Sequence, residues 1–375
     1  MSTSIHTGPF LIDGRPFSRA GLLAHCHMMV HACKNPDWFR KIFQFIEVFL
    51  KPESGAILQR SSGTTGDPKE FELERAAMET SALKTISFFK LEPGERVLLC
   101  LSVDYIAGKM MVVRALVGGL DLVLTEPSSR PFLSVEGSFS FAPMVPLQMV
   151  ESLKAGDDLS RTSILLIGGG ELPTTLKQLL VDSPGPMVYE SFGMTETYTH
   201  FGLRPINGPA PESSFRLLKD THIEKDERGC LVVDMKGVTK GAVVSNDLVD
   251  IGEGGDQFTW LGRLDNVIKT GGIKVIPEIL EEQIGSLLGY TVLILPVKDD
   301  KLGEKMVLLV ELDIVDPESN STENIAKWKS KLIPKLAPHE VPKEFIPVSE
   351  IPRNASFKPN RKVARELLSG RHDHT

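Results

Sequence analysis

The feature that most constrains this chain is a run of small and hydroxyl-bearing residues, Ser61-Ser62-Gly63-Thr64-Thr65-Gly66-Asp67-Pro68-Lys69. Such a run combines little side-chain bulk with several hydroxyl donors and closely spaced backbone N–H groups. It can therefore wrap polyphosphate oxygens, and Lys69 can add a point charge. An apolar stretch at 55–58 precedes the run, and a helical pattern from Glu72 to Phe89 follows it. This order predicts a strand, a phosphate-binding loop and a helix.

A flexible surface loop is the plainer interpretation of a Ser/Gly run, but the Pro-Lys ending and the flanking elements favour phosphate binding. The run is not a Walker A loop, because Asp67 and Pro68 separate Gly66 from Lys69. The G-x-x-x-x-G-K-[ST] spacing of P-loop nucleotidases is therefore absent. We expect a nucleotide-binding protein of another kind.

Short apolar segments alternate with helical segments over about the first 200 residues. The candidate helices lie within 20–50, 72–89 and 107–116, and the candidate strands are 96–101, 122–124, 139–142, 163–167 and 187–189. This alternation predicts an α/β fold with a parallel, doubly wound sheet.

The residue composition of the chain changes twice after about residue 200. From about 205, frequent Pro and Gly with short alternating strands predict a small antiparallel β subdomain. From about 262, segments rich in Lys and Glu predict strands at 292–296 and 306–311 and an amphipathic helix at 322–332. We therefore expect a large N-terminal domain with mixed sheets over 1–263 and a small, mobile α+β domain over 264–375.

Composition excludes several classes of protein. The 375 residues are enough for two domains with a large core, and the net charge of −7 argues against a general nucleic-acid binder. No stretch resembles a signal peptide or an 18-residue apolar span, so we expect a cytoplasmic protein that does not span a membrane. The oligomeric state stays open, with a homodimer as one option. The scattered cysteines, which are Cys26, Cys33, Cys100 and Cys230, indicate no disulfide framework.

Two further motifs in the first 200 residues fit nucleotide chemistry. Gly168-Gly169-Gly170 directly follows a strand, where glycines let a ligand approach the backbone or simply make a tight turn. In Tyr189-Glu190-Ser191-Phe192-Gly193-Met194-Thr195-Glu196, the last carboxylate can offer Mg²⁺ the hard oxygen that it prefers. Thr195 can donate to a phosphate, and Phe192 offers a flat face to adenine. An isolated Thr-Glu pair would otherwise be read as a helix N-terminus.

Three more motifs follow in the second half of the chain. The first is Ser245-Asn246-Asp247, where the carboxylate can accept from two vicinal ribose hydroxyls or form an Asx turn. The second runs from Trp260 to Glu278 and contains Arg263, Asp265 and the pair Gly271-Gly272. The third is Pro352-Arg353-Asn354-Ala355-Ser356-Phe357-Lys358-Pro359-Asn360-Arg361-Lys362.

Taken in order over residues 61–362, these motifs resemble the signatures of the acyl-adenylate-forming superfamily, which includes acyl-CoA synthetases, peptide-synthetase adenylation domains and luciferases. The resemblance implies binding of ATP, Mg²⁺ and coenzyme A. It implies that Lys358, Thr195 and Glu196 are catalytic and that Glu196 ligates the metal. Cofactor contacts are implied for Ser61, Ser62, Gly63, Thr64, Thr65, Gly66, Lys69, Gly168, Gly169, Gly170, Phe192, Gly193, Asp247, Arg263, Gly271 and Gly272.

The resemblance also assigns roles to the last two motifs. Asp265 would be the pivot between the domains, and Gly271 and Gly272 would line the passage of the thiol-bearing arm. Lys358 would bridge the acyl carboxylate and the α-phosphate. The sequence departs from the superfamily at Phe192, where Tyr is usual, and at Ser245-Asn246, where Thr-Gly is usual. Phe357 likewise replaces a usual Gly.

Only 60 residues precede the phosphate run, so the resemblance implies a first subdomain shorter than in typical members. Such a compact form resembles the short o-succinylbenzoate–CoA ligases of menaquinone biosynthesis. The similarity rests on Val103–Met111, Glu126–Ser129, Met144–Gln148 and Thr195–His200.

That acid carries a second carboxylate, which needs a cation or strong donors once it is buried. The candidate substrate residues are Lys109, Arg114, His200 and Arg204, although each can also be a solvated surface charge. Two alternatives stay open: a ligase for another aromatic or short acid, and a non-catalytic nucleotide-binding relative.

Overall fold

The computed structural model describes residues 6–51, 56–60, 70–170, 172, 174–181, 185–209, 212–312, 322–354 and 358–372. The predictions made for Ser61, Ser62, Gly63, Thr64, Thr65, Gly66, Lys69 and Phe357 lie outside these residues.

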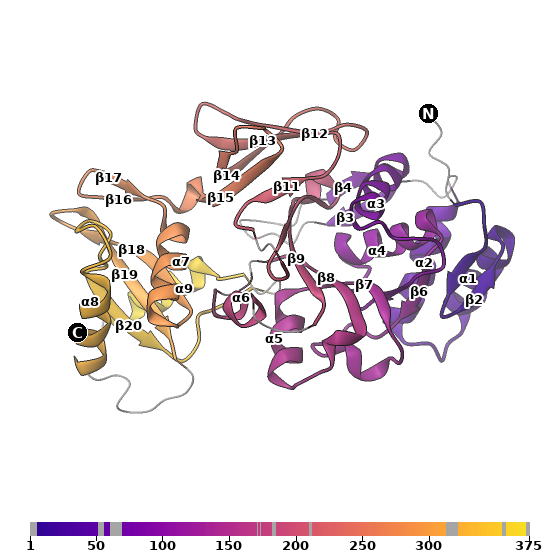
Figure 1. The fold of residues 1–375 in the computed structure, drawn as a ribbon, viewed down its shortest axis with the longest axis horizontal. Helices are drawn as coiled ribbons and strands as arrows, with labels where there is room; N and C mark the ends of the chain where they lie inside the picture. Colours follow the sequence, from indigo (N-terminus) through magenta and orange to yellow (C-terminus); the bar gives the residue numbers. More distant parts are fainter. Residues whose placement is uncertain are drawn as a thin grey trace.

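The elements alternate along the first half of the chain and become strand-rich in the second half (Figure 1). The helices are α1 (Arg19–His31), α2 (Asp37–Leu50), α3 (Arg75–Phe89), α4 (Ile106–Gly118), α5 (Pro146–Lys154), α6 (Thr174–Val181), α7 (Pro277–Leu288), α8 (Thr322–Leu332) and α9 (Arg361–His372), with short 3₁₀ turns η2 (Pro131–Ser134), η3 (Leu159–Arg161), η4 (Thr195–Thr197) and η5 (Leu264–Asn266).

The strands of the first half are β1 (Phe10–Ile12), β2 (Arg15–Phe17), β3 (Ile57–Arg60), β4 (Glu70–Leu73), β5 (Arg96–Leu99), β6 (Asp121–Leu124), β7 (Phe139–Met144), β8 (Thr162–Ile167) and β9 (Met187–Gly193). The strands that follow are β10 (His200–Pro205), β11 (Phe215–Leu217), β12 (Thr221–Lys225), β13 (Cys230–Met235), β14 (Val243–Ile251), β15 (Gln257–Arg263), β16 (Ile268–Thr270), β17 (Ile273–Val275), β18 (Val292–Asp299), β19 (Gly303–Glu311) and β20 (Glu344–Val348).

One 13-stranded sheet organises most of the chain, in the order β12-β13-β14-β15-β11-β10-β9-β8-β7-β5-β6-β1-β2. The six strands from β9 to β1 in this order run parallel, and those on either side of them join antiparallel. A mixed α/β fold with a large sheet was therefore predicted correctly.

The parallel strands are buried on both faces, as the continuous apolar runs in the sequence predict. In β5, Val97 and Leu99 pack into a core with α1–α4, whereas Leu98 packs into a second core with α5 and α6. The alternation of two residues along a strand thus divides one apolar segment between two layers of helices. This arrangement confirms the doubly wound prediction.

Two predicted details differ from the structure. The helix expected from Glu72 begins at Arg75, because the alternating Glu70-Phe71-Glu72-Leu73 forms β4 and pairs antiparallel with β3. The segment 61–69 therefore connects two strands of a ribbon rather than a strand and a helix. The β subdomain expected from about 205 is antiparallel, but it continues the large sheet through β10 and β11.

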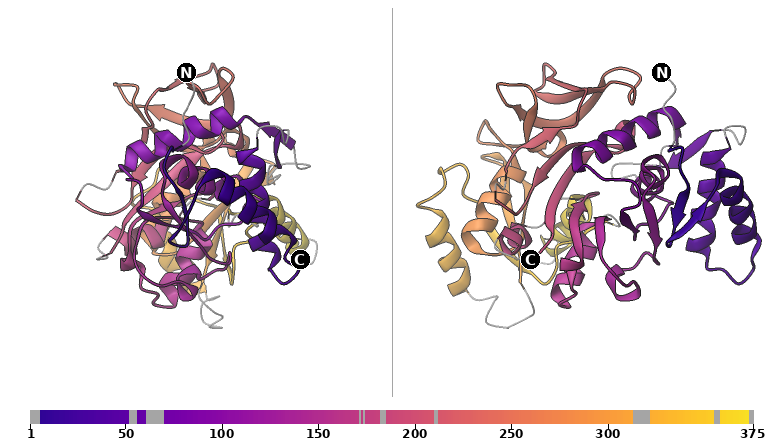
Figure 2. Two further views of the ribbon diagram at one scale, coloured as in Figure 1. Left: turned by 90° about the vertical axis from the view of Figure 1, so that its right-hand side faces the viewer. Right: turned by 45° about the vertical axis from the view of Figure 1, so that its right-hand side comes forward.

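Residues from 268 onward form a second sheet, in which β17, β16, β19 and β18 are antiparallel neighbours and β20 joins β19 in parallel. Its two faces have separate cores, one shared with α7 and α8 and the other with α9. This sheet lies at one end of the molecule, and α1 and α2 lie at the other (Figures 1 and 2). The expected domain boundary at 263/264 stays a prediction. Among the described helices, none is both long and apolar enough to cross a membrane.

The packing of α4 gives a test of this fold. A Cβ at Gly108 would overlap the backbone carbonyl of Ser102, which cannot move without disturbing the end of β5. We expect Gly108→Ala to lower the free energy of unfolding by about 1–3 kcal/mol, although Ala normally stabilises a helix. Urea denaturation would measure it, with Gly21→Ala in α1 as the control. The only atom near that Cβ is a serine hydroxyl, so the control should be neutral or stabilising. Equal changes in the free energy of unfolding for the two variants would contradict the close packing of Gly108 against Ser102.

Candidate nucleotide and acid site

The carboxyl ends of β8 and β9 define one edge of the parallel sheet, the position where ligands bind in open α/β folds. Gly168, Gly169 and Gly170 follow β8 directly. A Cβ at Gly168 would overlap the hydroxyl of Ser191 on β9, and Gly169 has φ +82°. Gly168 is therefore required for the close approach of Ser191, and contact of the three glycines with a nucleotide stays a prediction.

The turn after β9 carries Thr195 and Glu196 and is fixed from both sides. Met194 N–H donates to the Thr197 hydroxyl over 3.0 Å, and Glu74 N–H donates to the Tyr198 hydroxyl over 3.2 Å. Tyr198 has φ +64°, a conformation that bulky residues adopt only where the surroundings impose it. The two predicted catalytic residues thus sit on a rigid turn.

Glu196 is exposed on this turn, and within the described part of the chain its carboxylate makes no hydrogen bond or ion pair. An uncommitted carboxylate oxygen fits Mg²⁺, which takes one or two protein carboxylates and completes its shell with phosphates and water. The residue present therefore suits the predicted metal role.

Phe192 and Gly193 end β9 and pack differently from each other. The ring of Phe192 lies 5.2–5.7 Å from those of Phe201, Phe215 and Phe258, and its side chain is half-buried. A Cβ at Gly193 would overlap the backbone of Thr199 and His200. Gly193 is thus required for the close approach of β9 and β10, and stacking of adenine on Phe192 stays a prediction.

Arg114, from α4, is among the largest fully buried side chains of the protein, with 2% of its surface exposed. Its Nη2 donates to the Thr199 hydroxyl over 3.1 Å, and its buried Nε has no hydrogen-bond partner in the described structure. No described carboxylate forms an ion pair with it. Burial lowers the pKa of Arg114 to about 9, so the guanidinium stays charged at neutral pH.

His200 lies beside this cation and is also buried. Burial first, and Arg114 second, hold the pKa of His200 well below 6.5, so the imidazole is neutral at pH 7. Arginine only donates, so the Thr199 oxygen accepts from it and its hydroxyl proton is available for His200 Nδ1 at 3.3 Å. We assign the remaining proton to Nε2, which lies 3.0 Å from the Thr85 hydroxyl.

Arg204 is engaged elsewhere. Its Nε and Nη2 donate to Glu190 Oε2 over 2.9 and 2.6 Å, and its Nη1 donates to the Ser213 carbonyl over 2.7 Å. Lys177 also approaches Glu190, at 3.7 Å. Burial would raise the pKa of Glu190, but the two cations and the Leu172 N–H outweigh it and lower the pKa. These contacts favour a structural role for Arg204, and the substrate role stays a prediction.

Lys109 points to the ribbon formed by β3 and β4. Its Nζ donates to the Gln59 side-chain oxygen over 2.6 Å and to the Leu58 carbonyl over 3.3 Å. Burial lowers the pKa of Lys109. Lys109 and Arg114 therefore leave α4 in different directions, so of the four substrate candidates only Arg114 and His200 come together.

Asp247 lies on β14 opposite Arg263 on β15. Trp260 Nε1 donates to Asp247 Oδ1 over 3.0 Å, and Arg263 Nη1 lies 3.7 Å from the same oxygen. Arg263 Nη2 donates to Asp265 over 2.9 Å. Burial alone would lower the pKa of Arg263, but Asp265 and Asp247 raise it overall. The predicted ribose and hinge residues thus form one charged cluster.

Asn246, at a position where the sequence departs from the superfamily, joins this cluster. Its amide nitrogen donates to Asp265 over 3.2 Å, and its oxygen accepts from Arg228 over 3.0 Å. The departure therefore adds contacts to the predicted pivot rather than leaving a gap.

The remaining predicted residues lie on the second sheet. Gly271 (φ +57°) and Gly272 (φ +81°) form the two-residue turn between β16 and β17, a backbone geometry that favours glycine at both positions. Lys358 is exposed, and its backbone pairs with Asn354 in both directions. The predicted thiol passage and catalytic lysine stay predictions.

Sequence reasoning assigned no role to Glu190, Thr85 or Thr199. A glutamate inside the apolar strand 187–193 is a detectable signal, because a buried carboxylate needs a partner. The two threonines carry no such signal, since only the fold brings them to His200.

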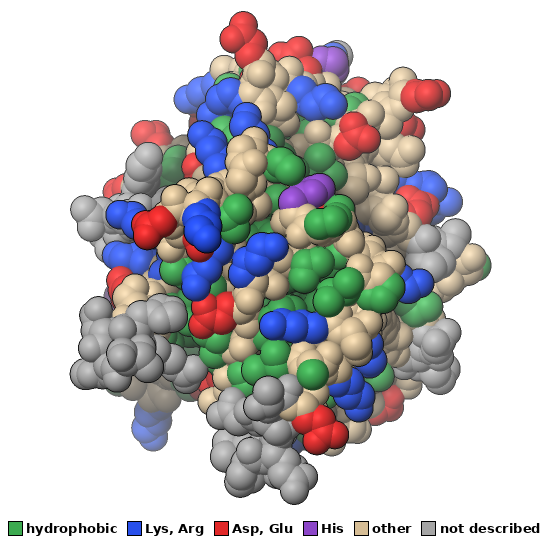
Figure 3. Space-filling model, turned by 90° about the vertical axis from the view of Figure 1, so that its left-hand side faces the viewer, with side chains coloured by type: hydrophobic (Ala, Val, Ile, Leu, Met, Phe, Trp, Pro, Cys, Tyr) green, Lys and Arg blue, Asp and Glu red, His purple; other side chains and the backbone are tan. Residues whose placement is uncertain are grey.

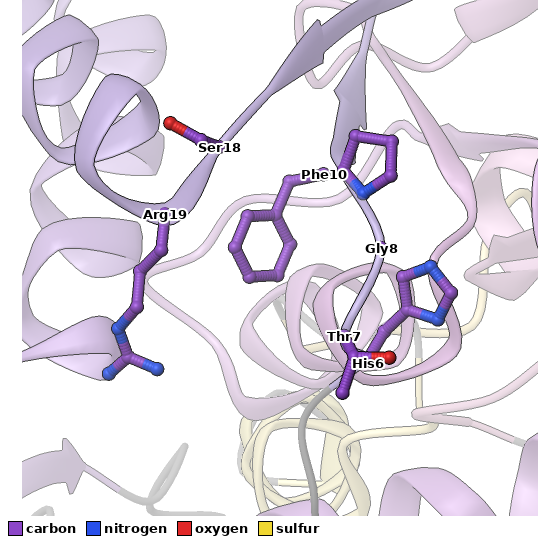
Figure 4. A pocket seen from close by; sticks show the side chains of 7 residues that line it. His6, Thr7, Gly8, Phe10, Ser18 and Arg19 are labelled. Carbon is purple, nitrogen blue, oxygen red and sulfur yellow. The ribbon is translucent and has the colours of Figure 1, made fainter.

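A cavity of about 520 Å³ lies away from these residues, beside β1 and the start of α1. Figure 4 shows His6 and Arg19 on either side of the Phe10 ring. Arg19 Nη2 donates to the Leu50 carbonyl over 2.5 Å. The lining contains none of the predicted site residues.

Comparison with known proteins identifies the family of this chain. Residues 11–241 match the model of the AMP-binding enzyme family. The 2-succinylbenzoate–CoA ligase of Bacillus cereus (strain AH820) is 26% identical over 376 residues, which cover 87% of this chain and 75% of the relative.

Two solved structures are similar. One is an acyl-CoA synthetase (AMP-forming)/AMP-acid ligase II-like protein from Dyadobacter fermentans, with 30% identity, a TM-score of 0.60 and coverage of 92% of this chain and 97% of that one. The other is ATP-bound MatB from Rhodopseudomonas palustris, with 21% identity, a TM-score of 0.72 and coverage of 83% of this chain and 67% of that one.

The buried Glu190 gives a test of the site's electrostatics. Glu190→Gln removes the buried negative charge that faces Lys177 and Arg204, so we expect a loss of about 3–5 kcal/mol in unfolding free energy at pH 7. Because the folded pKa lies below the ordinary 4.5, this contribution is present above that value and fades as the pH falls through the folded pKa. The difference in unfolding free energy between the variant and the wild type should therefore become smaller at acidic pH. Glu212→Gln, which removes a surface partner of Arg216, is the control and should cost under about 1 kcal/mol. A gap independent of pH would contradict the assignment.

Proposed function

Since this chain belongs to the AMP-binding enzyme family and is an ATP-dependent acid–CoA ligase, we propose that its acid carries a second anionic group and is o-succinylbenzoate. The 2-succinylbenzoate–CoA ligase that covers most of the chain supports this substrate. The single observation that carries the proposal is the buried Arg114, which has no carboxylate partner among the described residues.

The reaction proceeds in two half-reactions. A carboxylate oxygen of the acid attacks the α-phosphorus of ATP, and the bond to the bridging oxygen breaks, which releases pyrophosphate and leaves an acyl-adenylate. The thiol of coenzyme A then attacks the acyl carbon, loses its proton and displaces AMP. We assign neutralisation of charge in the first half-reaction to Lys358, and Glu196 would hold Mg²⁺, which would supply further positive charge at the phosphates.

Arg114 suits recognition of the second anion because of its place under the turn that bears Thr195 and Glu196. It reaches this turn through Thr199, and the neutral His200 beside it adds no competing charge. Little water screens a buried guanidinium, so it attracts an anion strongly at short range. An acid without a second charge would gain nothing from this cation.

The far end of the molecule suits the anionic coenzyme A. Lys269 and Lys274 are exposed and lie opposite each other across β16 and β17, beside the Gly271-Gly272 turn. Figure 3 shows Lys and Arg side chains spread over this end among apolar ones, with Asp and Glu side chains also present. These charges support the proposed entry of coenzyme A past the glycine turn.

The function is tested with ATP, Mg²⁺, coenzyme A and a panel of acids: o-succinylbenzoate, its mono-esters, benzoate and a medium-chain fatty acid. We expect pyrophosphate release and a thioester mass with o-succinylbenzoate. Lys358→Ala should lower the adenylation rate by about 10²–10³-fold, because the transition-state charge loses its partner. Pyrophosphate release with a different acid but not with o-succinylbenzoate would reject the proposed substrate. If neither the wild type nor Lys358→Ala releases pyrophosphate with any of the acids, the ligase activity is rejected.

Arg114→Met separates a ligand-binding role from a structural one. Replacing an unpaired buried cation by an apolar side chain of similar length should raise the free energy of unfolding by about 1–3 kcal/mol. The same change should lower kcat/KM for o-succinylbenzoate by roughly 10²-fold and leave the rates with benzoate nearly unchanged. Arg204→Met is the matched control. It removes the closer of the two cations that face the buried Glu190 and should destabilise the protein. A destabilised Arg114→Met with unaltered acid preference would reject the proposed role.

A further inference from the structure

The segment that carries Lys358 is held at both ends by arginine–glutamate pairs. On one side, Arg353 Nη2 and Nη1 donate to Glu311 on β19 over 2.6 and 3.1 Å, and Nη1 also donates to the Ile351 carbonyl over 3.0 Å. On the other side, Arg361 begins α9 three residues after Lys358. Both pairs are bidentate, the geometry that fixes a guanidinium best.

The Arg361 pair is the more extensive one. Its Nη1 and Nη2 donate to Glu281 over 2.8 and 2.7 Å, and Nη1 also donates to the Ile294 carbonyl over 2.8 Å. Glu281 itself accepts from the Ile294 N–H over 2.6 Å. All the partners are largely buried, so α9, α7 and β18 meet at this one guanidinium.

The same cluster reaches the predicted pivot. Glu278, one turn before Glu281 on α7, lies 3.4 Å from Arg361 Nη2 and accepts from the Asn266 amide over 2.5 Å. Asn266 directly follows Asp265. Glu278 also packs on the far side of the pivot, because a Cβ at Gly262 would overlap its carboxylate. Its Oε2 is buried there without a hydrogen-bond partner in the described structure.

These contacts differ in what a rotation at Asp265 would do to them. Asn266, Glu278, Glu281, Arg361 and Lys358 all follow the pivot in sequence, so their mutual contacts survive the rotation. The contact between Glu278 and Gly262 spans the pivot, so it breaks. It is a contact without a hydrogen bond, and it therefore costs little to release.

We propose that Arg361 is a positioning residue for Lys358, and that through Glu281 and Glu278 it ties the lysine rigidly to the segment that follows the pivot. The inference rests on the proposed two-step function. Lys358 would then enter and leave the nucleotide site as part of one body, at a fixed place relative to α7. A misplacement of about 1 Å in a catalytic group can cost 10²-fold in rate, so such an anchor has a kinetic consequence.

The proposal is tested by measuring the two half-reactions separately. Arg361→Met should lower kcat for pyrophosphate release by about 10–100-fold and leave KM for ATP and for the acid within about twofold. Thioester formation from supplied acyl-adenylate should change less than about threefold, because Lys358 has no part in that step. Arg361→Lys should keep an intermediate rate. Arg130→Met, which removes an arginine that pairs in the same way with Asp157, is the matched control and should leave both rates unchanged.

A double-variant comparison decides whether Arg361 acts through the lysine. In a Lys358→Ala background, Arg361→Met should cause no further loss of adenylation rate. A loss that adds in full to that of Lys358→Ala, or an equal loss in both half-reactions, would overturn the proposal. Glu281→Gln, which keeps the shape of the pair, repeats the comparison if Arg361→Met does not fold. If the wild-type protein releases no pyrophosphate with any acid, the proposed function fails; an active wild type with unaffected variants rejects only the role of Arg361.

Discussion

Buried charge is the constraint on which the rest of this structure depends. A guanidinium or carboxylate taken out of water must find a partner or cost several kcal/mol, and this protein treats its buried charges in three different ways. Glu190 has two cations and a backbone donor. The guanidinium of Arg361 is shared by two carboxylates, those of Glu278 and Glu281. Among the described residues, Arg114 finds a threonine hydroxyl and no carboxylate. The first two arrangements stabilise packed elements. In the third, the guanidinium of Arg114 can still attract an anion beside the turn that carries the predicted catalytic residues.

The sequence predicted the fold where local pattern and tertiary environment agree. The helix at 322–332 was predicted with its observed bounds, because its amphipathic pattern is uninterrupted. The parallel strands were recognised from apolar runs, since both of their faces are buried. The prediction failed at Glu72, where alternating residues were assigned to the helix that follows. Glu72 and Leu73 are compatible with either a helix or a strand, and the presence of β3 opposite them decides the outcome.

The predicted site residues also differ in whether a local motif or the tertiary fold determines their partners. Residues whose predicted chemistry is carried by the backbone or by one side chain, such as Gly168 or Glu196, were assigned from the motifs alone, and these assignments stay predictions. Charged residues could be found but not assigned, because Arg114 and Arg204 look alike in sequence. One faces a hydroxyl and a neutral imidazole, and the other faces Glu190. Which partner each arginine meets is decided by the order of strands in the sheet, since β9 and β10 place Glu190 opposite Arg204. No local pattern contains that information.

The proposed use of Lys358 in only half of the reaction would combine two requirements that oppose each other. The lysine must be held to within a fraction of an ångström during adenylation, and it must then leave the site. A flexible segment would satisfy the second requirement and lose the first. Arg353 and Arg361 flank Lys358 on a sheet with its own cores, an arrangement that would satisfy both requirements, because the rigidity would be internal to the part that is proposed to move. The contact of Glu278 with Gly262 across Asp265 can then stay weak without any loss of precision at the lysine.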